Sequence, residues 1–189
     1  KLEASESLQQ CIERELLEFE RLVKKGYKEA AVAKFSSLKN VRFAGLLEGL
    51  VERFRSEVAT SKFNDGLDLF RKGSFDRADA LFVKSLEFDD APNYHGSLLY
   101  HQGMAALRLK DFTRSADILR RALEFKLNKS ILGDARYHLA YAHDRMGEKR
   151  TAKDLYFRFF QRHRKHGFAP RAKRRYERLK AKRNKKKKG

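Results

Sequence analysis

The sequence repeats itself with a spacing of 37 residues, and this repeat strongly limits what the chain can fold into. Matching segments begin at this spacing at two sets of positions: Gly66, Gly103 and Ala140, and then Ala78, Ser115 and Ala152. A fixed period of this size is typical of units that cannot bury their own apolar faces and must stack on neighbours. Stacked units present an extended surface, so the repeat favours binding over catalysis.

Each repeat predicts two helices joined by a short turn. The composition supports helix, with 41% hydrophobic residues, 37% charged residues and only 2 prolines, and the strong helix formers are plentiful. The expected helices cover residues 60–72, 75–88, 95–109, 112–126, 131–146 and 149–163. The segment 42–72 is amphipathic throughout and leaves two alternatives open. It forms one long helix, or it breaks near Thr60 and Ser61, which could cap a new helix.

Glycine and proline mark the turns between these helices. Gly73 and Gly147 stand between the two helices of the first and third repeats, where glycine suits a left-handed helix end. Pro92 stops helix propagation between the first two repeats. Before the repeats, residues 5–38 carry an apolar stripe at helical spacing that Gly26 interrupts, which predicts a helical hairpin.

A further helix is expected after the repeats. Gly167 is expected to end the last repeat helix, and Pro170 can lie in the first turn of another helix. The apolar residues of that helix fall on one face: Ala172, Tyr176 and Leu179. A terminal helix needs such a face to cover the end of a stack. The lysine-rich run after Ala181 repels itself, so we expect it to be disordered.

These units resemble the tetratricopeptide repeat (TPR) family over residues 60–163. The family pattern has a small residue midway along the first helix, which Gly66, Gly103 and Ala140 match. It then has a turn of glycine, acid and aromatic residue followed by alanine, but the third repeat lacks the aromatic. Phe159 stands where the pattern has a small residue, so we expect the final repeat helix to pack less closely.

The resemblance implies an all-α fold: a right-handed α-solenoid of TPR-like helical hairpins, with an extra N-terminal helical hairpin and a basic C-terminal capping helix. It also implies three regions. Residues 1–59 form a degenerate helical repeat, and residues 168–189 form the basic helix and tail. Between them, residues 60–167 contain repeats at 60–93, 97–130 and 134–166.

In that family the first helix of each hairpin lines a concave groove, which implies a partner site here. Alignment on the period places these residues in the groove: Phe63, Asn64, Leu67, Tyr100, His101, Met104, Tyr137, His138 and Tyr141. Such a lining would suit an amphipathic or aromatic protein segment. In the alternative interpretation the tyrosines only fill the packing between helices. The lysine and asparagine that the family uses to clamp a terminal carboxylate are absent here, which disfavours a receptor for chaperone tails.

The C-terminal end carries most of the charge. Of the net charge of +19, the segment Arg162–Lys188 contributes +14, because fifteen Lys or Arg residues face the single acid Glu177. The candidate polyanion-binding residues are Arg171, Lys173, Arg174, Arg175, Arg178, Lys180, Lys182, Arg183, Lys185, Lys186, Lys187 and Lys188. Such a run could bind nucleic acid, an anionic membrane surface or an acidic protein, or simply solubilise a capping helix. No aromatic residue follows Tyr176, so any nucleic-acid contact would be to the backbone.

Residue patterns for catalysis, cofactors or metals are missing from the sequence. We find no glycine-rich phosphate loop, paired-cysteine zinc pattern or His-Glu-x-x-His helix, and we expect no catalytic residue, cofactor or metal. His163 and His166 lie three apart, but basic neighbours would repel a cation. Cys11 is the only cysteine, so no internal disulfide can form; we interpret it as a half-buried apolar residue. No apolar stretch approaches the roughly 18 residues that span a bilayer. A cytoplasmic location is slightly favoured over export or the nucleus.

Our leading interpretation is a non-catalytic scaffold that binds a protein or peptide segment in its groove as a subunit of a larger assembly. Its basic end would contact a polyanionic partner. The alternative is a nucleic-acid- or ribosome-associated protein that acts mainly through the basic C-terminus. A homo-oligomer formed by stacking of terminal repeats is a further option.

Overall fold

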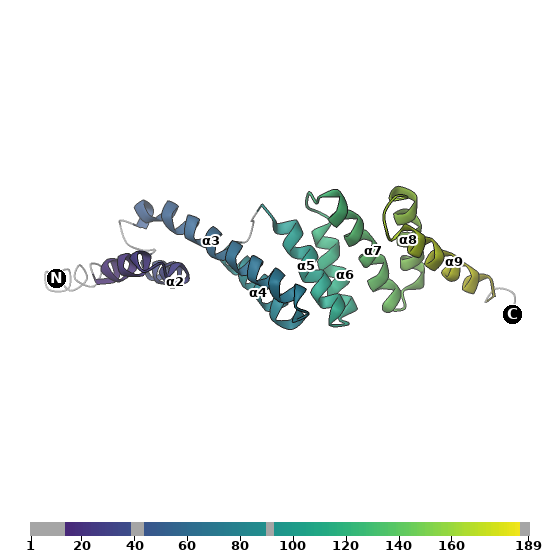
Figure 1. Ribbon diagram of the computed structural model, residues 1–189, viewed down its shortest axis with the longest axis horizontal. Helices are drawn as coiled ribbons and strands as arrows, with labels where there is room; N and C mark the ends of the chain where they lie inside the picture. The colour runs from purple at the N-terminus through teal and green to yellow at the C-terminus, as the bar shows by residue number, and fades with distance from the viewer. Residues whose placement is uncertain (1–13, 39–43, 90–92, 186–189) are drawn as a thin grey trace, which may run out of the picture. The chain divides into compact units, whose positions relative to one another are not determined.

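The computed structural model describes residues 14–38, 44–89 and 93–185, and all regular structure in these ranges is helical (Figure 1). After a helical stretch over residues 14–24, the helices are α2 (Lys28–Leu38), α3 (Ala44–Arg71), α4 (Phe75–Phe88), α5 (His95–Arg108), α6 (Phe112–Ala122), α7 (Lys129–Arg145), α8 (Lys149–Arg162) and α9 (Ala169–Lys185). Cys11, Pro92 and Lys186–Lys188 lie outside the described residues, so the expectations placed on them stay open.

The chain divides into two units, and α3 and α4 each contribute to both. The first unit comprises residues 1–62 and 84–90, and the second comprises residues 63–83 and 91–189. Because α3 is continuous from Ala44 to Arg71, the long-helix alternative is confirmed. Thr60 and Ser61 are both exposed, and the helix passes through them without a break.

The first unit is built around a small apolar core. Phe19, Ala31, Val32, Phe35 and Val51 are buried there, and the rings of Phe19 and Phe35 lie 6.3 Å apart. The turn before α2 has Gly26 at φ +74°, a left-handed conformation that glycine adopts without steric cost. The predicted N-terminal hairpin is therefore confirmed for residues 14–38.

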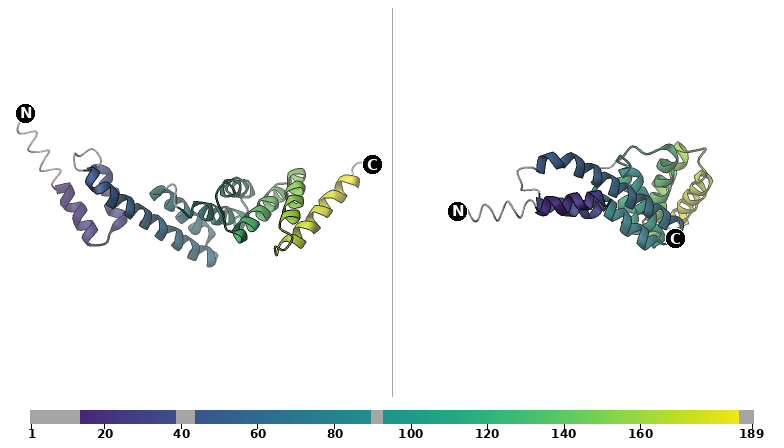
Figure 2. Two further views of the ribbon diagram at one scale, coloured as in Figure 1. Left: turned by 90° about the horizontal axis from the view of Figure 1, so that it is seen from above. Right: turned by 60° about the vertical axis from the view of Figure 1, so that its left-hand side comes forward.

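In the second unit, helices α5 to α9 pack side by side in chain order (Figure 2). Helix α5 packs on α6, α6 on α7, α7 on α8 and α8 on α9, and α5 also contacts α7. We call α3, α5 and α7 the first helices, and α4, α6 and α8 the second helices. The predicted capping helix is α9, which buries Ala172 and Leu179 against a core that includes Tyr156 and Phe159.

Small residues at the repeat period allow each pair of helices to approach closely. A Cβ atom added to Gly66 would lie 2.6 Å from the Phe82 ring, and one added to Gly103 would lie 2.8 Å from Leu119. Both distances are too short for real atoms, so a larger residue at either position would force the neighbouring side chain or the helix to shift. Phe82 and Leu119 are themselves 37 residues apart, so the close approach is a property of the repeat.

The turns inside the three hairpins share one backbone conformation. Gly73, Lys110 and Gly147 have φ values of 80°, 66° and 84° and are spaced by the period. The glycines confirm the predicted left-handed helix ends. Lys110 adopts the same conformation with a side chain, which strains the backbone.

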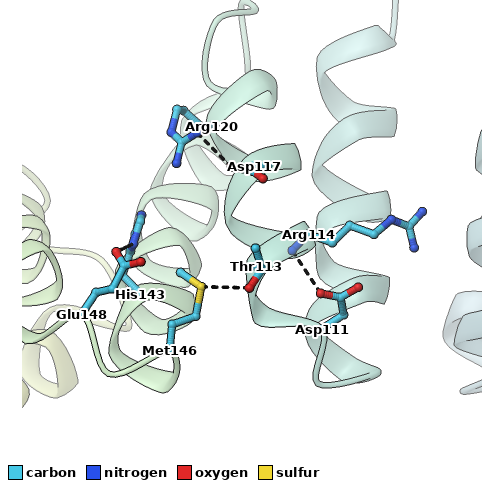
Figure 3. Close-up of polar contacts among 8 residues, drawn as sticks. All are labelled: Asp111, Thr113, Arg114, Asp117, Arg120, His143, Met146 and Glu148. Atoms are coloured by element: carbon cyan, nitrogen blue, oxygen red, sulfur yellow. Dashed lines mark hydrogen bonds and ion pairs between the residues drawn. The ribbon is translucent and has the colours of Figure 1, made fainter.

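Side chains next to these turns fix where the following helices begin. Asp111 accepts a hydrogen bond from the backbone N–H of Arg114 at 3.1 Å and so caps α6 (Figure 3). In the same view Thr113 donates to the sulfur of Met146 at 3.4 Å, which links the start of α6 to the turn after α7. Asn128 caps α7 by accepting from the backbone N–H of Ile131 at 2.8 Å.

Several predicted helix ends are wrong. Helix α6 ends at Ala122 rather than near residue 126. Helix α8 ends at Arg162, within one residue of the predicted end at 163, so Gly167 lies in a loop and ends no helix. Pro170 does lie in the first turn of α9, as expected, but α9 continues to Lys185 instead of becoming disordered after Ala181.

Two histidines pack back onto the hairpin just after the end of α8. The His163 ring stacks on Phe159, with 5.2 Å between ring centroids. His166 packs against Gly133, where a Cβ would lie only 2.5 Å from its ring. Phe159 is fully buried, so the expectation of loose packing in the final repeat is wrong: the aromatic residue fills the space under α9.

Candidate binding face

The predicted groove residues divide into buried and surface-reaching sets. Phe63, Tyr100 and Met104 are only 8%, 8% and 6% exposed. They are core residues, and among the tyrosines the packing alternative therefore describes Tyr100. Six of the nine keep some exposure, and one of these, His101, lies among buried rings; the other five are Asn64, Leu67, Tyr137, His138 and Tyr141. We call these five residues the binding face.

An aromatic cluster under this surface joins α3 to α5. Phe63 stacks on Tyr94 with 4.7 Å between centroids, and its ring lies 5.9 Å from that of Phe82. His101 lies among these rings, 5.8 Å from Phe70 and 5.0 Å from Tyr100. Burial, with a smaller contribution from the charge of Arg71, lowers the pKa of His101 to about 4. The imidazole is therefore neutral at neutral pH and acts as a packing residue.

Asp134 connects α5, α7 and the loop after α8. The Tyr100 hydroxyl donates to its carboxylate at 3.5 Å, and His166 Nε2 lies 3.5 Å from the same carboxylate. Burial raises the pKa of Tyr100, and the charge of Asp134 adds to the shift. His138 Nδ1 donates to the carbonyl oxygen of Asp134 at 2.8 Å. Burial nevertheless lowers the pKa of His138, so this side chain is also neutral.

The C-terminal end of the binding face is aromatic. Tyr137 stacks on Phe168 with 4.3 Å between centroids and 14° between planes. The Tyr141 hydroxyl accepts a hydrogen bond from Arg145 at 2.8 Å. Burial raises the pKa of Tyr137, while the charges of Arg171 and Arg174 act in the opposite direction, so both arginines lie close enough to Tyr137 for their charges to act on it.

Helix α9 continues the series of first helices in the same register. Two sets of buried positions recur at the 37-residue spacing, and each set ends on α9: Leu98, Ala135 and Ala172, and then Ala105, Ala142 and Leu179. Exposed residues follow the same rule. Arg174 takes the position of Tyr137, and Arg178 takes the position of Tyr141. By register, α9 therefore repeats the positions that the binding face occupies on α7.

Comparison with known proteins was made at the levels of sequence and structure. No protein-family model and no curated protein matches the sequence. The first TPR domain of human RPAP3 superposes with a TM-score of 0.56 at 22% identity, over 69% of this chain and 98% of that domain. The first TPR of Spaghetti (RPAP3), bound to the HSP90 peptide SRMEEVD, gives 0.54 at 21% identity, over 67% and 93%. The Sgt2 TPR domain from Aspergillus fumigatus gives 0.53 at 19%, over 69% and 82%.

The chain has the tetratricopeptide-repeat fold. Identities this low show the fold alone. The predicted all-α solenoid of TPR-like hairpins is confirmed, while its division into three repeats stays a prediction.

Arg175, one of the predicted polyanion-binding residues on α9, already has a partner within the chain. Arg175 forms two hydrogen bonds with Asp144, one of them at 2.9 Å between Nη2 and Oδ1. The Asp144 side chain is only 2% exposed, and its hydrogen bonds raise the pKa of Arg175. Arg175 therefore anchors α9 to the stack and is not available to a partner.

The side chains of the other basic residues on α9 are described only in part. Five of them project from α9 into solvent: Arg171, Lys173, Arg174, Arg178 and Lys180. Lys182, Arg183 and Lys185 belong to the helix, but their side chains lie outside the described residues. Sequence reasoning treated this helix as a second, separate site. Extending the 37-residue period from α7 into α9 would have placed Arg174 and Arg178 at the positions of Tyr137 and Tyr141.

A basic cavity of about 820 Å³ lies where the loop after α8 meets the start of α7. Lys129, Arg162, Arg164 and Lys165 line it, with Asp134 as the acid among them. His163 Nε2 accepts a hydrogen bond from the guanidinium of Arg136 at 2.9 Å. This ring nitrogen is therefore already engaged and does not offer a ligand to a metal ion. Within the described ranges no cluster of three or more potential metal ligands occurs, and none of the helices there is long and apolar enough to cross a membrane.

Proposed function

We propose that this chain is an adaptor that binds a segment of a partner protein on the binding face and catalyses no reaction. The observation that supports the proposal is that Leu67 and Tyr141 stand at equivalent positions of the repeat on first helices, and that both, like Tyr137, keep part of their side chains exposed. Partly exposed tyrosines supply large contact areas at small entropic cost. The structurally similar TPR domain of Spaghetti holds a peptide, which supports the same class of ligand here.

The experiment is a selection of peptides from a random library on the full chain, followed by affinity measurements with variants. Leu67→Ala combined with Tyr141→Ala removes an aliphatic and an aromatic side chain from the binding face. The matched control is Val83→Ala combined with Phe157→Ala. These two side chains are 38% and 42% exposed and lie on second helices.

Loss of the Leu67 and Tyr141 side chains should weaken the selected peptides by about tenfold or more, because anchor residues dominate such interfaces. The control should keep the affinity within about twofold. Equal losses in the two variants, with both still folded by circular dichroism, would exclude the binding face as the peptide site.

A nucleic-acid- or ribosome-associated role is the second candidate, supported by the exposed cations of α9. Deleting α9 cannot test it, because the deletion would expose Tyr156 and Phe159 of the core. Replacing Arg171, Arg174 and Arg178 with glutamine leaves that core intact. If this variant loses binding to RNA in a salt-dependent manner while library peptides still bind, the second candidate is favoured.

A further inference from the structure

Each first helix of the second unit ends with an arginine at the same point of the repeat. Arg71, Arg108 and Arg145 lie in the last turns of α3, α5 and α7, separated by 37 residues. All three are exposed. We call them the arginine file. Neither the groove residues nor the basic tail singled out by the sequence included this file.

Two members of the file rest on aromatic rings in an equivalent way. The guanidinium of Arg108 lies 6.0 Å from the ring centroid of Phe75, and that of Arg145 lies 4.7 Å from that of Phe112. Phe75 and Phe112 each begin a second helix and are themselves one period apart. A guanidinium stacked on a ring is held in orientation while its edge N–H groups stay free to donate.

A basic residue in the last turn also interacts favourably with the helix dipole, but any cation at any register would do so. The repeated stacking goes beyond that need. Among the described residues Arg108 and Arg145 form no ion pair, and the pair between Arg71 and Asp68 is exposed, at 71% and 62%. An exposed pair of this kind is weak, so a ligand carboxylate can replace Asp68 at little cost.

On α7 the file contacts the binding face, and α9 carries three further exposed arginines at the register of that face. Arg145 donates to the Tyr141 hydroxyl, and the charge of Arg108 acts on both Tyr100 and His138. On α9, Arg174 and Arg178 occupy the positions of Tyr137 and Tyr141, and Arg171 lies 5.7 Å over Phe168. One surface therefore carries surface tyrosines and a line of arginines.

We propose that the arginine file, together with Arg171, Arg174 and Arg178 of α9, binds an extended acidic segment of a partner protein. This rests on the proposed function and names the chemistry of its ligand. Guanidinium forks match carboxylates in bidentate geometry, and the file supplies them at one register along the stack. Proteins that hold single-stranded nucleic acid commonly add stacking on open aromatic faces, whereas arginines lie over Phe75, Phe112 and Phe168.

The test measures binding of fluorescein-labelled decaglutamate to the full chain by anisotropy. The file variant is Arg71→Gln, Arg108→Gln and Arg145→Gln, and a cap variant replaces Arg171, Arg174 and Arg178 in the same way. The control carries Arg77→Gln, Arg120→Gln and Arg158→Gln on second helices, where these residues are also exposed. All three variants lose the same net charge, so a general attraction by the basic chain affects them equally.

The file and cap variants should each weaken decaglutamate binding by about tenfold or more, and the control by about threefold at most. Equal losses of decaglutamate affinity in all three variants would show that only the overall positive charge attracts the ligand, and would overturn the proposal. Tighter binding of oligothymidylate than decaglutamate, lost in the file variant, would overturn it in favour of nucleic acid. Suppose that the Leu67 and Tyr141 substitutions weaken binding of library peptides, while the file variant binds decaglutamate as tightly as the parent chain. The proposed function then stands and this inference falls.

Discussion

Lys110 is the one described residue other than glycine that has a positive φ, at 66°. A left-handed conformation costs an L-residue on the order of 1 kcal/mol, and the first and third hairpins avoid that cost with Gly73 and Gly147. Lys110→Gly should therefore raise the free energy of unfolding by about 0.5–1 kcal/mol, measured by urea denaturation.

The matched control for this prediction is Gly147→Ala. No atom lies within 4 Å of the added Cβ there, so its cost is purely conformational, and stability should fall by about 1 kcal/mol. A Lys110→Gly variant that is no more stable than the parent would contradict the strain argument.

The neutral His101 makes the fold sensitive to acid. Its pKa is about 4 in the folded chain and about 6.5 in the unfolded chain. Below pH 6.5 the unfolded state therefore binds the extra proton, and the stability present above that pH is lost as the pH falls towards 4. The loss should reach on the order of 1–2 kcal/mol by pH 5.

His101→Phe should remove this part of the acid loss. Urea denaturation of both proteins at pH 7 and pH 5 isolates the effect, because the other titrating groups are common to both. Identical losses of stability in the two proteins would show that His101 is protonated within the fold.

The sequence alone could predict which face of a helix a residue lies on, but not how deeply its side chain is buried. The period put Tyr100 and Tyr137 at equivalent positions, and the structure buries the first while leaving part of the second at the surface. The difference arises from neighbours: Tyr100 is covered by the adjoining α7 and reaches Asp134, whereas Tyr137 packs on Phe168 from the loop. Such contacts depend on side chains distant in sequence, which no local pattern encodes.

Among the elements, the attachment of α9 depends on one buried carboxylate. Arg175→Met would leave Asp144 charged and 2% exposed without its partner. Removing one member of a buried pair is strongly destabilising, but Arg175 itself is partly solvated, so we expect a loss of about 1–3 kcal/mol. Hydrogen exchange in residues 169–185 should accelerate more than exchange in α5.

The double variant Arg175→Met, Asp144→Leu tests the cause. Replacing both partners with apolar residues removes the uncompensated charge and should recover most of the lost stability. If the double variant is as unstable as the single one, packing by the arginine stem rather than its charge holds α9.

The helices themselves were largely predictable from the period, because each needs only an apolar stripe and a turn signal. Their ends were less so. Gly167 reads as a stop signal, yet α8 ends at Arg162, where the His163 ring stacks back on Phe159. Continuity of α3 through Thr60 could not be predicted either. Serine and threonine can cap the start of a helix, but they also occur within helices, so their presence does not decide between the two.

For the whole molecule, the excess of positive charge should oppose folding at low ionic strength. The net charge is +19, and like charges on α8 and α9 repel when the helices dock. The Tm should rise as sodium chloride is increased from about 50 mM to about 500 mM, since screening shortens the range of that repulsion.

The cap variant of Arg171, Arg174 and Arg178 gives the control for this salt effect. With three fewer charges it should melt higher at low salt and respond less to added salt. A Tm that falls with salt in the parent chain would mean that ion pairs such as Arg175–Asp144 outweigh the repulsion. The charge asymmetry itself was plain from the sequence, but its place beside the tyrosines needed the register of α9.

The junction of α8 and α9 gives the protein an intrinsic optical probe. The chain has 7 tyrosines and no tryptophan, so phenol emission is not masked by indole. Tyr137, Tyr156 and Tyr176 all belong to the packing at this junction. Release of the last helix would transfer these phenols to water, and ultraviolet difference spectra could follow that step in unlabelled protein.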